Sequence, residues 1–347
     1  MAKRAAGYGA AGIAGVFLLV LAAATGFGTV NVWAQRISFA IATGPSSGTY
    51  FPVGEAIAGL ISHPPGSDRC GNASVCGPEG LIATAQTSAG SAANVMAVNS
   101  GRVDSALAQS DVVAEAVNGT GQFRGRKQTH IRVIASLFPE DIHLVVRRKS
   151  RITSVEGLRG KRVSIGPADS GTALTARAVL AAYRPRNVRV SIDSADSAAQ
   201  KLEAGKIDAF FFVGGPPIPL VQALISSGTA ALVPIDGTPR ERLIARGEGL
   251  TADTISASVY GNGEAVPTLA EQSLWIVNDS EPADIVYALA RALFAPSNRA
   301  RLREGPHNLR LISLSQATKD LPAPLHPGAA RFFRDEGQQA NYTTKPL

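Results

Sequence analysis

The feature that most constrains the fold is a pattern that occurs twice along the chain in the same order. In each copy a short strand-like segment leads into a Ser-Gly-Thr turn and a helical segment. A Gly-(Arg/Lys)-(Val/Ile)-Asp-(Ser/Ala) step then leads into another strand-like segment. The copies comprise residues 37–42, 47–49 and 101–105, and residues 162–166, 170–172 and 205–209. Because helices join successive strands, the strands should be parallel, and the pattern predicts two lobes of similar α/β construction.

Three further strand-like segments indicate how the chain connects the lobes. Residues 131–137 and 142–146 lie between the two copies, and residues 274–277 form a strong late strand. We expect the first two to lead from lobe one to lobe two and the last to lead back, which makes a hinge of two crossings. The chain has 347 residues, and single hydrophobic cores usually stop growing before that length. The predicted boundaries are 36–138 plus 250–347 for lobe one and 139–249 for lobe two.

The first residues are typical of a secretory signal peptide. Lys3 and Arg4 precede a run without charge that ends before Arg36, and its densest apolar part is residues 13–24. Val32-Trp33-Ala34 fits the small-residue cleavage site, so we expect residues 1–34 to be removed. The alternative is an uncleaved membrane anchor, since an uncharged run of this length is long enough to span a bilayer. In both cases the remaining chain is exported.

The only two cysteines, Cys70 and Cys76, lie in the polar segment 63–80. In an exported protein, one close pair in a loop rich in Gly and Pro predicts a disulfide. A zinc site would need two further ligands, and only His63 is near, so we expect no metal. The segment lengthens the first copy of the repeat.

The charge of the chain excludes one class of partner. Without the leader, 32 Lys and Arg stand against 27 Asp and Glu. The basic residues are scattered and have no interleaved aromatic residues, so we expect no nucleic-acid binding.

Both Ser-Gly-Thr turns are predicted to lie where α/β proteins bind ligands. Ligands occupy the space beyond the carboxyl ends of the strands, where helix N-termini present unpaired N–H groups. Glycine lets the backbone approach a ligand, and the hydroxyl groups add donors, so two facing turns suit a small carboxylate. The alternative is that each turn only caps a helix.

Other polar residues follow strands or begin helices where a cleft would meet them. The full set of predicted ligand-binding residues is Ser46, Ser47, Gly48, Thr49, Tyr50, Thr87, Ser91, Asn94, Gln109, Ser110, Ser170, Gly171, Thr172, Gly214 and Gly215. If the turns hold the ligand, valine at Gly48 or at Gly171 should weaken binding at least tenfold, about 1.4 kcal/mol.

One motif suggests a hydrolase instead. Residues 44–48 match the Gly-x-Ser-x-Gly pattern of a nucleophile elbow around Ser46, and Asp284 and His326 follow in a permissible order. However, Pro52 would lie inside the helix that must begin at the nucleophile, and the motif follows the first strand rather than a mid-sheet strand. We therefore expect no catalytic residues and no enzymatic activity. Since no Walker pattern or well-placed dinucleotide motif occurs, we expect no cofactor.

Several of these motifs together resemble one known family. They are Ser47-Gly48-Thr49-Tyr50-Phe51-Pro52-Val53-Gly54, Gly90-Ser91-x-x-Asn94, Gly101-Arg102-Val103-Asp104-Ser105, Gln109-Ser110-Asp111-Val112, Gly214-Gly215-Pro216-Pro217 and Leu325-His326-Pro327-Gly328-Ala329. They look like the TAXI family of solute receptors for tripartite ATP-independent periplasmic (TRAP) transporters. The similarity runs over nearly all of the chain after the leader, and the first and last motifs are fairly specific.

The resemblance implies a two-lobed periplasmic-binding-protein-like fold and a monomeric receptor in the periplasm. It implies closure on a ligand such as glutamate, glutamine or a 2-oxo acid, and a membrane permease partner driven by an ion gradient. The segment 63–80 departs from the simplest pattern, and its role stays open between the cleft rim, the permease contact and the cover of a core edge. A periplasmic sensor with the same fold and a signalling partner is the alternative function, and the ligand's identity stays open.

Overall fold

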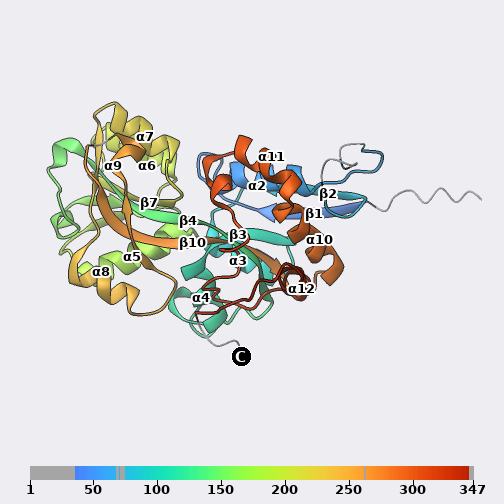
Figure 1. Ribbon diagram of the computed structural model, residues 1–347. Helices are drawn as coiled ribbons and strands as arrows, with labels where there is room; N and C mark the ends of the chain where they lie inside the picture. The colour runs from blue at the N-terminus through green and yellow to red at the C-terminus, as the bar shows by residue number, and fades with distance from the viewer. Residues whose placement is uncertain (1–35, 68–69, 71–74, 262, 344–347) are drawn as a thin grey trace, which may run out of the picture. The chain divides into compact units, whose positions relative to one another are not determined.

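The computed structural model describes residues 36–67, 70, 75–261 and 263–343 (Figure 1). The predicted signal peptide lies outside them. In the described part of the chain, no helix is both long and apolar enough to cross a membrane. Residues Ile37–Leu347 form one unit.

One mixed sheet of ten strands runs through this unit, in the order β2-β1-β3-β10-β4-β7-β5-β6, with β8 paired to β4 and β9 to β10. The strands are β1 (Ile37–Ala42), β2 (Leu81–Gln86), β3 (Ser105–Gln109), β4 (Ile131–Arg147), β5 (Arg162–Ser164), β6 (Arg189–Ser191), β7 (Ala209–Gly214), β8 (Ala230–Val233), β9 (Thr251–Ile255) and β10 (Val266–Asn278). β1 pairs in parallel with β2 and β3, and β5 pairs in parallel with β6 and β7. The parallel pairing predicted for both copies of the repeat is confirmed.

The helices follow the strands as the repeat predicts. They are α2 (Tyr50–Ile61), α3 (Ser91–Asn99), α4 (Ser110–Asn118), α5 (Gly171–Tyr183), α6 (Ala195–Glu203), α7 (Pro219–Ser226), α8 (Gly237–Ile244), α9 (Ala257–Tyr260), α10 (Ala283–Phe294), α11 (Arg299–Glu304) and α12 (Pro327–Asp335). Short 3-10 helices are η2 (Gly121–Phe123), η3 (Arg148–Ser150), η4 (Glu156–Leu158), η5 (Pro296–Asn298) and η6 (His307–Leu311). In α2, for example, Val53, Ile57 and Ile61 recur every four residues and are fully buried against the sheet.

Two long antiparallel strands, β4 and β10, connect the two parallel parts of the sheet. β10 pairs with β3 over Ser273–Val277, and β4 pairs with β7 over Asp141–Val146. Between these contacts β4 and β10 pair with each other. Figure 1 shows both strands running from the β1–β3 part to the β7 part.

The buried apolar residues form three clusters. The first holds residues from Phe39 to Phe138 and from Leu274 to Phe333, and we call the part of the chain that packs there lobe one. The second and third hold residues from Ile142 to Leu269, on the α5 and α8 side and on the α6, α7 and α9 side of the sheet, and we call that part lobe two (Figure 1). β9 and the first half of β10 form a hairpin, in which Leu269 packs in the second cluster and Ile255 in the third.

The predicted disulfide between Cys70 and Cys76 is present, with an S–S distance of 1.98 Å. On either side of it the chain returns to the core edge, because Gly77 N–H donates to Ile61 O and His63 N–H donates to Leu81 O, both at 2.8 Å. These hydrogen bonds hold His63 and Gly77 next to the end of α2 and the start of β2.

Candidate functional site

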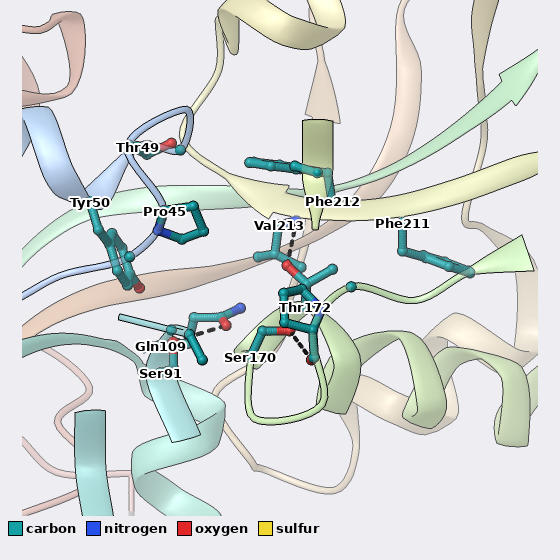
Figure 2. Close-up of a pocket in the computed structure, with 18 of the residues that line it drawn as sticks. Pro45, Thr49, Tyr50, Ser91, Gln109, Ser170, Thr172, Phe211, Phe212 and Val213 are labelled. Carbon is teal, nitrogen blue, oxygen red and sulfur yellow. Dashed lines mark hydrogen bonds between the residues drawn. The ribbon is translucent and has the colours of Figure 1, made fainter. Parts of the chain in front are cut away.

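A cavity of about 70 Å³ lies between lobe one and lobe two, and this volume limits a ligand to a small molecule (Figure 2). Both Ser-Gly-Thr turns line it. The predicted residues that line it are Gly48, Thr49, Tyr50, Ser91, Gln109, Ser170, Gly171 and Thr172. The repeat therefore brings together the two turns that the sequence separates widely.

The lobe-one turn leads into α2 without capping it. Thr49 stands at the N-cap position, but its side chain accepts no hydrogen bond from the helix. The third residue of the helix is Pro52, which has no N–H, so the usual donor to an N-cap hydroxyl is missing. In the described residues the Thr49 hydroxyl makes no hydrogen bond, which leaves it available to a ligand.

The lobe-two turn caps its helix in full. Ser170 Oγ accepts a hydrogen bond from Ala173 N–H at 3.0 Å and donates one to Pro167 O at 2.7 Å. α5 begins at Gly171 itself. Thr172 Oγ1 accepts from Val213 N–H at 3.2 Å, so its own proton is left for another acceptor (Figure 2). The Ser170 hydroxyl group therefore both donates and accepts within lobe two. The first N–H groups of α5 have no backbone acceptor within the helix.

Gly171 of lobe two lies close to Gln109 and Ser91 of lobe one. A β-carbon at Gly171 would lie 1.2 Å from Gln109 Oε1 and 2.8 Å from Ser91 Oγ. Nearby, Ala93 N–H donates to Asp169 O at 3.1 Å, and Ser47 Oγ donates to Asp196 Oδ2 at 2.8 Å. These contacts join the lobes across the cavity, so the structure has the closed arrangement.

Gln109 offers a donor to the cavity. Ser91 Oγ donates to Gln109 Oε1 at 3.1 Å, which places Nε2 at the other end of the amide. Gln109 is 4% exposed, and its Nε2 has no hydrogen-bond partner among the described residues. Because an unpaired buried amide is costly, this N–H group suits a ligand oxygen.

The charged residues that line the cavity are both acidic. Glu140 is 2% exposed, its Oε2 accepts from Tyr50 OH at 2.5 Å, and burial raises its pKa to about 7. Although burial opposes it, hydrogen bonds from Lys201 and Ser191 lower the pKa of Asp193. No Lys, Arg or His belongs to the described lining.

Several predicted residues lie outside the lining. Asn94 Nδ2 donates to Thr43 O at 2.6 Å and to Leu107 O at 2.7 Å, which ties α3 to two strands. Ser110 donates to Glu271, and Ser46 and Thr87 are exposed. The remaining three, which also do not line the cavity, are Ser47, Gly214 and Gly215.

The sequence analysis missed part of the lining. These residues are Gly44, Pro45, Ala89, Gly90, Glu140, Ser164, Gly166, Pro167, Asp193, Ala195, Ala198, Phe211, Phe212 and Val213. A signal for Glu140 was present, because Glu140 and Asp141 interrupt an otherwise apolar crossing between the lobes.

The residues of the hydrolase hypothesis have structural partners. Nδ1 of His326 accepts from Gly328 N–H at 3.2 Å and caps α12. Asp284 pairs with Arg331 at 2.8 Å. Neither side chain bonds the other in the described residues.

Several solved structures resemble this chain at low identity. The protein MatC of Rhodopseudomonas palustris with bound malate is 12% identical, with 86% of this chain and 96% of that chain covered and a TM-score of 0.48. A protein of Bordetella bronchiseptica RB50 is 16% identical, with 87% and 83% covered and a TM-score of 0.46. The alkanesulfonate-binding protein SsuA of Xanthomonas axonopodis pv. citri, bound to MOPS, is 14% identical, with 87% and 92% covered and a TM-score of 0.44.

The fold class is mixed α/β, with one large sheet and helices on it, as predicted. A match to one protein family covers residues 41–337, nearly the whole described chain. This chain therefore belongs to the NMT1-like family.

Proposed function

We propose that this protein is an exported solute receptor that closes its two lobes on a small carboxylate and delivers it to a TRAP permease. The observation that carries the ligand class is the convergence of four helix N-termini on one cavity. α2, α3, α5 and α6 each place residues of their first turn in the lining. Helix N-termini present unpaired N–H groups and a partial positive charge, which favour an anion without any cationic side chain.

The donors of the cavity fit the oxygens of a carboxylate. Gln109 Nε2 and the Thr49 hydroxyl are unpaired, and the Thr172 hydroxyl retains its proton. A carboxylate oxygen accepts several hydrogen bonds at once, so donors from both lobes are satisfied together only when the lobes are closed.

The ligand proposal is tested with a panel of L-glutamate, L-glutamine and 2-oxoglutarate, and their methyl esters as controls. The midpoint temperature of thermal unfolding should rise with at least one free acid, since a ligand at 100 times its Kd stabilises the folded protein by about 2.7 kcal/mol. The ester should give a smaller shift. Equal shifts for acid and ester would contradict a carboxylate site.

Delivery to a TRAP permease rests on the resemblance of the motifs around Gly48, Asn94 and His326. The gene beside this one should encode a multi-spanning permease, and vesicles holding that permease should take up the ligand only when this protein is added. If the neighbouring gene encodes a histidine kinase and the receptor changes its phosphorylation, the protein is a sensor instead.

A further inference from the structure

Two carboxyl groups face each other on the strands that join the lobes. Glu140 of β4 and Glu271 of β10 are direct partners in the antiparallel register. Side chains at such positions lie on the same face of the sheet, with their β-carbons about 5 Å apart. Both residues are nearly inaccessible, with exposed fractions of 2% and 1%. The pair lies under the cavity, which Glu140 lines.

One oxygen atom of the pair is buried without a hydrogen-bond donor among the described residues. Glu140 Oε2 accepts from Tyr50 OH, and Glu271 Oε2 accepts from Ser110 N–H at 2.7 Å and from Ser110 Oγ at 3.2 Å. The other oxygen of Glu271 is buried without a donor among the described residues, and its neighbour is the Glu140 carboxyl. Two ionised carboxylates cannot bond each other, whereas one carboxyl group holding a proton donates to the other.

Charged groups around the pair do not neutralise it. On β4, Asp141 is buried, and burial keeps His143 uncharged by lowering its pKa to about 4. α4 contributes Asp111, which raises the pKa of both glutamates after burial itself. Other elements that pack against β4 contribute three further titratable groups. They are Tyr50 on α2, Asp253 on β9 and Tyr260 on α9. These groups are acidic or neutral, so a proton is the species that relieves the charge.

Residues of both lobes enclose these carboxyl groups. Tyr50 and Ser110, which donate to the pair, belong to lobe one, whereas Phe212 and Val213, which line the same cavity as Glu140, lie on β7 of lobe two. In the same way Thr175 of α5 donates to Asp111 of α4 at 2.9 Å. Separation of the lobes removes donors and admits water, so the full burial of the pair is a property of the closed form.

The direction of the linkage follows from this burial. Burial raises the pKa of Glu140 to about 7 and that of Glu271 further above its ordinary value. When the lobes separate, hydrated glutamates return toward their ordinary pKa of about 4.3. At pH values between the pKa of the open form and that of the closed form, closure of the lobes therefore takes up protons. The closed form is favoured at low pH and becomes less stable as the pH rises.

We propose that the closed receptor holds one proton between Glu140 and Glu271, so that a ligand anion and a proton enter the protein together. This inference rests on the proposed function for the ligand's charge. The bound proton removes a negative charge from beneath the anion, and a monocarboxylate is then taken up without a change in net charge. The receptor's affinity is thereby set by the pH of its compartment.

The first test is calorimetry of L-glutamate binding in buffers with different heats of ionisation. At pH 6, between the open-form pKa of about 4.3 and the closed-form pKa of about 7 for Glu140, we expect proton uptake on ligand binding, and Kd should rise about tenfold from pH 5.5 to pH 6.5. The carboxylates of glutamate are ionised throughout this range. Binding with no proton uptake and a constant Kd would overturn the proposal.

The second test is the substitution Glu271→Gln, which keeps the shape of the side chain and an acceptor for Ser110. Calorimetry at pH 6 should find about one proton fewer taken up than in the parent, and Kd should depend less on pH between 5.5 and 6.5; the buried Asp111 and Asp141, whose pKa values burial also raises to about 7, account for the remainder. The control is Glu115→Gln, a partly buried acid on α4 outside the pair, which should keep the parent's pH dependence. A Glu271→Gln protein that takes up as many protons as the parent would contradict the assignment of the site.

A third measurement needs no ligand and separates this inference from the proposed function. In solution scattering, the radius of gyration of the parent protein should be smaller at pH 5.5 than at pH 8, and that of the Glu271→Gln variant should be the same at both. If no carboxylate binds but this difference is present, the proton site stands and the ligand proposal fails. If the parent's radius does not change with pH, the proton site fails.

Discussion

The two Ser-Gly-Thr turns have the same three residues, but the helices after them begin at different points. In lobe two the serine is the N-cap and the glycine is the first residue of α5. In lobe one the threonine is at the N-cap position, and α2 begins at the residue after it, Tyr50. Two features oppose a cap: Pro52 has no N–H group, and Thr49 has helical rather than extended backbone angles, with φ −71° and ψ −37°. In lobe two the Ser170 hydroxyl group is therefore bonded to the helix, and only backbone N–H groups at the start of α5 remain available to a ligand. In lobe one the Thr49 hydroxyl group remains available to a ligand in the cavity.

The largest expected effect is that of Gly171→Val, which tests the close approach of lobe two. The new β-carbon would lie 1.2 Å from Gln109 Oε1, so the closed arrangement cannot form without displacement of Gln109 or of α5. Kd for the carboxylate should rise at least tenfold, about 1.4 kcal/mol. Ligand should no longer reduce the radius of gyration in solution scattering.

The fold should survive this substitution, because Gly171 begins a helix and its backbone lies outside the left-handed region that favours glycine. Circular dichroism of the variant should match that of the parent. A folded Gly171→Val protein that binds the carboxylate as the parent does would show that the cavity is not the ligand site.

The second largest effect is expected on stability, and it tests whether only the lobe-two turn caps its helix. Ser170→Ala removes the acceptor of Ala173 N–H and should lower the free energy of unfolding by about 1 kcal/mol. Thr49→Ala is the matched variant and should change stability by much less, since no cap bond is lost. Urea denaturation measures both. Equal losses of stability would mean that the turns do not differ in this way.

How far the sequence predicted this site depends on which contacts are local. The repeat predicted the parallel strands and both turns, because periodicity and turn residues act within a few positions. The position of Pro52 in the first turn of α2 was also predictable, because it depends only on neighbouring residues. The approach of Gly171 to Gln109 could not be predicted, because the two residues belong to different lobes and neither local sequence indicates the other. The same holds for Glu140 and Glu271, whose pairing depends on the register of distant strands.

A smaller effect is expected for Thr49→Val, which keeps the shape of the side chain and removes only the hydroxyl group. The Thr49 hydroxyl has no partner in the described residues, so its loss should leave stability unchanged. If it donates to the ligand, Kd should rise about threefold, within the usual net value of one hydrogen bond. An unchanged Kd would remove Thr49 from the ligand contacts.

The smallest effect is expected for Gly48→Ala, although the sequence alone predicted that Gly48 and Gly171 would be equally sensitive. A β-carbon at Gly48 would lie 3.3 Å from Pro45 O and 4.0 Å from Phe212 Cζ, and it would meet no atom as closely as the one at Gly171 would. A shift of Pro45 by a few tenths of an ångström accommodates it. Kd should therefore stay within about twofold of the parent value. A tenfold loss would instead mean that the backbone of Gly48 touches the ligand directly, and the two turns would then contribute in the same way.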